Sequence, residues 1–123
     1  MSKNQHRTLY SDVELEEFRS IISKKLTRAK EQFNFYRQQI KDWADNPDFK
    51  IKGLDDGAGV AEYEQLCAMS ARQEKLIQHL QNAIIRIDNK VYGICRVTGK
   101  LIDKDRLRAV PHATLSVEAK SGQ

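Results

Sequence analysis

Few residues in this chain of 123 have the types and spacing that chemistry needs. Asp55 and Asp56 are adjacent carboxylates in a glycine-rich stretch, where they could hold a metal ion or simply make a turn. The two cysteines, Cys67 and Cys95, are too few for an all-cysteine zinc site, which needs four thiolates. The sequence shows neither a paired nucleophile and base nor a good phosphate-binding loop. It therefore predicts a binding protein and not an enzyme.

The elements that position these residues are predicted to be helices. Ser11 and Glu14 have the form of a capping box, which predicts a helix from Asp12 to Trp43. Apolar residues then recur in steps of three and four, as in a coiled coil. This first stripe comprises Leu15, Phe18, Ile22, Leu26, Ala29, Phe33, Tyr36, Ile40 and Trp43. A second stripe comprises Tyr63, Leu66, Ser70, Gln73, Ile77, Leu80, Ile84, Ile87 and Val91, in which Ser70 and Gln73 are polar.

Two such helices joined by one loop bury their stripes most simply against each other in an antiparallel hairpin. Asn46-Pro47 and the glycines that follow break the pattern, which predicts a tip loop over about 44–60. The predicted fold is mainly α. It has a flexible leader at 1–10, a long antiparallel two-helix coiled-coil hairpin at 11–91, a small knob at 92–120 and a tail at 121–123.

The knob segment is short and has its own turn signals. Thr98-Gly99-Lys100 separates two short apolar pairs, which predicts a small hairpin. Pro111 is predicted to lie in the first turn of a final helix that runs to about Lys120.

Charge is distributed unevenly along the chain. Between Asp42 and Glu64 there are seven acidic and two basic residues, so this segment carries −5 and the rest of the chain +9. Loops are often polar, but an acidic tip on a basic body also suits presentation to a metal ion or a basic channel.

No apolar stretch approaches the length of a membrane span, and we expect a cytoplasmic protein with free thiols.

The segment from Tyr92 to Ala119 closely resembles the C-terminal finger of the DksA/TraR family. It keeps Tyr-Gly-x-Cys at 92–95 and, further on, the family's Arg-Leu-x-Ala-x-Pro-x-Ala at 106–113. The resemblance extends to the upstream Ala71–Lys75 and to the two-helix layout. It departs at the four zinc-ligand positions, which hold Cys95, Thr98, Ser116 and Ala119. One thiolate and two hydroxyls are a poor zinc set, even with help from His112, so we expect a degenerate zinc finger that folds without metal.

The resemblance implies that the chain binds RNA polymerase, as a monomer, and inserts its hairpin into the secondary channel to modulate initiation. The family's tip motif falls on residues 52–57, where Lys52 and Gly57 depart from it and Asp55 matches. Asp55 is therefore the first choice for the residue near the active centre, and Asp56 the second. Arg72 matches a basic residue near the channel rim, although it could also be an ordinary solvent-facing helix residue.

The family's site for guanosine tetraphosphate falls on His79, Val110 and Lys120. Only Lys120 keeps the basic character, which argues against a response to this nucleotide.

Other functions fit parts of the sequence. A coiled-coil adaptor that docks another helix would also have such stripes and is the main alternative. Direct sequence-specific DNA binding is not expected, because the basic residues of the knob do not lie on an evident recognition helix. A transcript-cleavage factor would use a similar hairpin with paired tip carboxylates, but the finger sequence argues against it.

Overall fold

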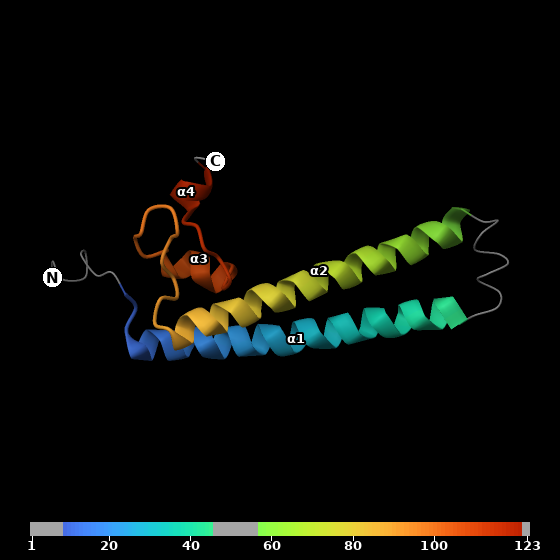
Figure 1. Cartoon of the computed structure of the whole chain (residues 1–123), viewed down its shortest axis with the longest axis horizontal. Coiled ribbons are helices and arrows are strands. Elements are labelled where there is room, and N and C mark those ends of the chain that lie inside the picture. Colours follow the sequence, from blue (N-terminus) through green and yellow to red (C-terminus); the bar gives the residue numbers. More distant parts are fainter. Residues whose placement is uncertain (1–8, 46–56, 122–123) are drawn as a thin grey trace. The chain divides into compact units, whose positions relative to one another are not determined.

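The computed structural model of the chain describes residues 9–45 and 57–121. Within them lie two long helices, α1 (Asp12–Asp45) and α2 (Gly57–Asp88), and two short ones, α3 (Lys104–Ala109) and α4 (Val117–Ser121) (Figure 1). The predicted fold class, two long helices followed by a small C-terminal finger region, is confirmed.

The first helix begins where its capping box predicts. The backbone N–H of Ser11 donates to Glu14 Oε1 at 2.9 Å, and the N–H of Glu14 donates to Ser11 Oγ at 3.2 Å. Each side chain thereby satisfies a backbone donor that the first turn of the helix leaves without a partner.

The predicted tip loop is too long at both edges. Ala44 and Asp45 still belong to α1, and α2 already begins at Gly57. A helix can continue up to the residue before a proline, which here is Asn46, so α1 gains two residues. Glycine in a first helical turn is tolerated even though it lowers helix propensity. Residues 46–56, with Asp55 and Asp56, lie outside the described residues.

The second helix ends before the predicted Val91. The N–H of Lys90 donates to Ile87 O and the N–H of Val91 to Arg86 O, both at 2.9 Å. Lys90 has a positive φ of 61°. This pair of bonds around a left-handed residue is a Schellman motif, which terminates α2 and leaves Val91 exposed.

The chain divides into two units, one comprising residues 1–26 with 79–123 and the other residues 27–78. In the first unit, the start of α1 and the end of α2 are antiparallel, because Arg19 pairs with Asp88 and Asp12 pairs with Lys90. Lys104 of α3 pairs with Glu14 and so joins the finger to the start of α1.

The core of this first unit is aromatic at its centre. The ring of Phe18 lies 5.7 Å from that of Tyr10 and 5.3 Å from that of Tyr92. The Tyr10 hydroxyl donates to Ile102 O, and the Tyr92 hydroxyl donates to Pro111 O at 2.7 Å. Both phenols thus satisfy their polar end on the finger backbone while the rings stay buried. The other largest fully buried side chains are Ile22, Leu80, Cys95, Ile102 and Leu107.

The second unit pairs the rest of α1 with the rest of α2. The Trp43 and Tyr63 rings lie 6.4 Å apart, so the end of α1 adjoins the start of α2 and the helices are antiparallel here as well. Only Ala29 and Ser70 are buried among the residues of this unit whose side chains are described. Two helices alone cannot enclose large side chains, and the polar position Ser70 is accommodated in the seam.

The finger contains the predicted small hairpin, but its final helix begins later than predicted. In the hairpin, Ile94 and Leu101 form an isolated antiparallel β-bridge. Pro111 lies in a turn, and the last helix begins only at Val117, because Ser116 provides its cap. Helix α3 was not predicted from the sequence.

No helix in the described part of the chain combines the length and apolar character that crossing a bilayer requires.

Candidate functional site

Three of the four zinc-ligand positions of the finger come together: Thr98 and Ser116 both contact the sulfur of Cys95, and Ala119 is hydrogen-bonded to Ser116. The Cys95 N–H donates to Lys100 O, and the Gly99 N–H donates to Cys95 O, both at 2.8 Å. This tight turn, with φ of 72° at Gly99, places Thr98 beside Cys95. The second half of the finger joins it where the Arg96 N–H donates to Thr114 O at 2.9 Å.

The sulfur is buried and accepts hydrogen bonds from both halves. The backbone N–H groups of Thr98 and Ser116 each lie 3.4 Å from Cys95 Sγ. Hydrogen bonds, first of all from the Thr98 side chain, lower the pKa of Cys95 to about 6 against the opposing effect of burial.

These residues do not fit a zinc ion. A structural zinc site needs four sulfur or nitrogen donors, and the four positions supply one sulfur, two neutral hydroxyls and a methyl group. Elsewhere in the described residues, no three His, Cys, Asp or Glu side chains gather in a way that could hold a metal. The other cysteine, Cys67, lies on α2 in the second unit and is half-buried.

A basic pocket of about 250 Å³ lies between the end of α2 and the finger, within the first unit. It brings together His79, Val110 and Lys120, the three positions that the family resemblance assigns to a nucleotide site. Arg86 and Arg106 line it as well. Val110, the residue before the proline, supplies no charge. The permanent cations of the pocket are Arg86, Arg106 and Lys120.

His112 occupies the wall of this pocket. Its ring stacks on His79 at 5.4 Å with an angle of 7°, and Arg86 Nη2 donates to the His112 carbonyl at 3.5 Å. His112 Nδ1 is buried and has no hydrogen-bond partner among the described residues. Burial, then the nearby charges of His79, Arg86 and Lys25, lower the pKa of His112. Burial also lowers the pKa of Arg86.

Sequence reasoning missed Arg86 and Arg106 as pocket residues. Arg86 follows His79 by seven positions, which puts both on one face of α2, so its helical spacing was a usable signal. Arg106 had no such signal, because α3 and its contact with the second half of the finger depend on tertiary structure. There Arg106 Nε donates to Leu115 O at 2.8 Å.

The hairpin residues predicted to contact polymerase lie elsewhere. Arg72 is exposed on α2 in the second unit. The acidic residues on either side of the undescribed segment are also exposed in this unit: Asp42, Asp45, Glu62 and Glu64. Asp42 and Asp45 fall in the last four residues of α1, and the last turn of this helix contains no basic residue. Carboxylates are unfavourable at the negative end of a helix dipole, so helix stability does not explain their placement.

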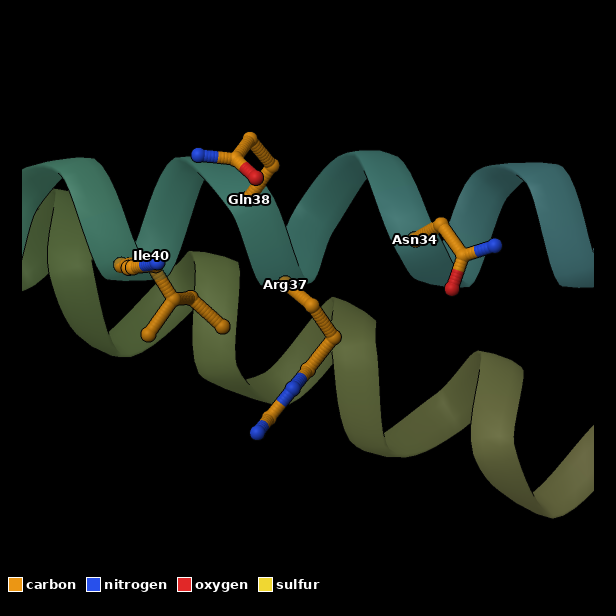
Figure 2. Close-up of a pocket in the computed structure, with 5 residues that line it drawn as sticks. Asn34, Arg37, Gln38 and Ile40 are labelled. Atoms are coloured by element: carbon orange, nitrogen blue, oxygen red, sulfur yellow. The ribbon is translucent and has the colours of Figure 1, made fainter.

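A second groove runs along α1 in the same unit and is shown in Figure 2. It has a volume of about 500 Å³ and is lined by Asn34, Arg37, Gln38, Ile40 and Lys41. In that view Arg37 and Ile40 extend toward α2 while Gln38 projects from the opposite side of α1. Its lining offers cations and amides but no buried polar group, so it shows no sign of a built ligand site.

Comparisons with known proteins agree with the finger assignment. Residues 90–123 match the prokaryotic dksA/traR C4-type zinc finger. The RNA polymerase-binding transcription factor DksA of Caulobacter vibrioides is 47% identical over 49 residues, which are 40% of this chain and 34% of that protein. General stress protein 16O of Bacillus subtilis is 36% identical over 47 residues, which are 38% of this chain and 29% of that protein. The chain thus spans about a third of the length of these curated relatives.

The fold has a match among solved structures. Transcription factor DksA2 from Pseudomonas aeruginosa superposes with a TM-score of 0.77 over 90% of this chain and 83% of that one, at 23% identity. At this identity the match establishes the fold. In its finger sequence, its curated relatives and its two-helix fold, the chain is similar to proteins of the DksA/TraR family.

Proposed function

We propose that this protein is a transcription regulator that binds RNA polymerase in the cytoplasm as a monomer and performs no reaction itself. The observation that carries this proposal is the finger segment, residues 90–123, whose sequence matches that of polymerase-binding relatives. The packing of this segment supports it: the finger is tied to α1 by the Lys104–Glu14 ion pair and to the residues just before α1 by the Tyr10 phenol.

We propose further that the acidic end of the helical hairpin enters the secondary channel of polymerase. Asp42, Asp45, Glu62 and Glu64 support this role, because they concentrate charge around the segment that contains Asp55 and Asp56 at some cost to α1. The effect on initiation would follow from binding one state of the promoter complex more tightly than another. Arg72 would contact the channel rim.

A pull-down with purified RNA polymerase, followed by a promoter transcription assay, tests both roles. Asp55→Asn should keep binding and lose the effect on transcription, with Asp56→Asn showing a smaller loss. Glu17→Gln is the matched control, because Glu17 is exposed on α1 in the first unit and its change removes the same charge. Equal effects of the tip and control variants would contradict the tip role.

Arg72→Ala should weaken polymerase binding by about tenfold, the range that loss of one interface contact of about 1.4 kcal/mol gives. Lys75→Ala is its control, because it removes an exposed cation from the same stretch of α2. If the unaltered protein does not bind polymerase, the proposal is wrong and a coiled-coil adaptor becomes the better explanation.

We also propose that regulation does not depend on guanosine tetraphosphate. His79 and Val110 stand where the family resemblance places two basic side chains, and only Lys120 remains. The transcriptional effect should therefore be the same with and without the nucleotide. An effect that increases with nucleotide concentration and disappears in Lys120→Ala would contradict this.

A further inference from the structure

We propose that in this finger the hydrogen-bonded sulfur of Cys95 performs the joining role that zinc performs in a C4 finger, so that the fold is independent of metal. This inference does not depend on polymerase binding. It rests on what the structure shows at the four ligand positions.

The sulfur joins the same two parts of the chain that a zinc ion would join. A C4 zinc holds one pair of ligands from each half of the finger. Here Cys95 Sγ accepts one N–H from Thr98, in its own turn, and one from Ser116, 21 positions further along. Both donors are backbone groups, so the link fixes the main chain of both halves directly.

The other three positions hold residues that suit this arrangement. Thr98 Oγ1 accepts the Lys100 N–H at 3.2 Å, which closes the turn around Gly99. Ser116 Oγ accepts the Ala119 N–H at 3.1 Å and so caps α4. Ala119 contributes only a backbone donor and a methyl group. Threonine, serine and alanine therefore form a consistent set in place of three thiolates.

Packing around the sulfur supplies the rest of what a metal-free finger needs. Cys95, Ile102 and Leu107 are all fully buried. The hydroxyl groups of Tyr10 and Tyr92 bond to the finger backbone at Ile102 and Pro111. The Tyr10 bond thus ties the finger to the residues just before α1, and the Tyr92 bond closes the finger on itself, whereas an isolated zinc finger depends on its metal.

Metal analysis of the purified full chain is the first test. We expect less than about 0.1 zinc per chain and an unfolding temperature that a chelator does not change, whereas a structural site would hold about one zinc. Stoichiometric zinc, or a chelator that lowers the unfolding temperature, would overturn the proposal.

Amide hydrogen exchange separates the acceptor role of the sulfur from its packing role. Cys95→Val keeps an apolar side chain of similar size but removes the acceptor. We expect exchange at the Thr98 and Ser116 amides to become about tenfold faster, while the Lys100 amide changes less. Cys67→Val is the matched control and should leave both amides protected. Unchanged protection in Cys95→Val would mean that the sulfur merely fills space.

A gain of metal binding provides the converse test. The triple change Thr98→Cys, Ser116→Cys and Ala119→Cys restores thiols at the three other ligand positions, two of which already contact the Cys95 sulfur. In reducing buffer we expect this variant to bind about one zinc per chain and to lose stability on chelation. Cys67 is untouched and serves as an internal control for stray thiol binding. A folded variant that binds no zinc would show that these positions no longer have the arrangement of a finger.

Discussion

At the scale of single residues, Gly93 shows how tightly the finger fits against the start of the chain. It has a φ of 81°, and a Cβ built on it would lie 2.6 Å from Tyr10 Cε2 and 3.2 Å from Leu107 Cδ1. Glycine is therefore needed here for two separate reasons, conformation and space.

Replacing Gly93 by alanine should lower the free energy of unfolding by about 3 kcal/mol, since strain and overpacking add. Gly99→Ala is the control, because Gly99 has φ of 72° but nothing lies within 4 Å of its Cβ position. It should cost only about 1 kcal/mol, the strain alone. Urea unfolding of both variants measures the difference, and equal losses would mean that the contact with Tyr10 does not matter.

His112 makes stability depend on pH. Its pKa is lowered in the folded chain, chiefly by burial and then by His79, Arg86 and Lys25. The unfolded chain therefore binds the proton more readily, so the free energy of unfolding falls as pH drops below the ordinary histidine value of about 6.5. The stability that neutral His112 contributes is complete above that pH, and it is lost as the pH falls through the lower pKa of the folded chain.

We expect His112→Asn to flatten this acid slope in unfolding curves recorded between neutral and mildly acidic pH. His79→Asn removes the stacked partner and one repelling charge, so it should reduce the slope and not abolish it. A slope that is unchanged in His112→Asn would assign the pH dependence to another group.

Local residue patterns were predicted well, and tertiary contacts were not. The capping box of Ser11 and Glu14 could be read from the sequence because both partners lie within one turn. The gathering of Arg86, Arg106 and His112 could not, because it depends on how α3 and the turn at Pro111 pack against α2. The roles of Asp55, Asp56 and Arg72 stay predictions.

At the scale of elements, the two long helices follow from their apolar periodicity, and their ends depend on a few backbone groups. Periodicity extended the second stripe to Val91, whereas α2 stops at Asp88. The left-handed residue that follows this end of α2 is Lys90. A lysine with positive φ gives no signal in the sequence.

Lys90→Gly should therefore raise the free energy of unfolding by about 0.5 kcal/mol, because glycine adopts positive φ without strain but loses more chain entropy. The exposed ion pair of Lys90 with Asp12 is lost in this variant and contributes little. Asn89→Gly, one residue earlier, should instead destabilise. Thermal unfolding of the two variants checks the sign, and a destabilised Lys90→Gly would contradict the Schellman assignment.

At the scale of the whole molecule, buried side chains are concentrated in one of the two units. All seven of the largest fully buried side chains belong to residues 1–26 and 79–123. The other unit buries only Ala29 and Ser70 among its described side chains. Helix α2 contributes to both units, so its side chains are more deeply buried in one part of the helix than in the other.

Native-state hydrogen exchange should reveal this difference along α2. Amides of residues 61–78 should exchange at least about tenfold faster than those of residues 80–87, because local opening of the unit with few buried side chains, residues 27–78, exposes little apolar surface. Comparison within one helix limits the effect of intrinsic helix propensity. Uniform protection along α2 would mean that the two units open together.

The bond from the Tyr10 hydroxyl to Ile102 O joins positions 92 apart in the chain. A change to the residues around Tyr10 should therefore alter the stability of the finger. An affinity tag fused immediately before Tyr10, or a deletion that removes this residue, should loosen the finger without touching its sequence. Purification handles for this protein belong at the carboxyl terminus, and assays of a shortened chain should retain the tyrosine.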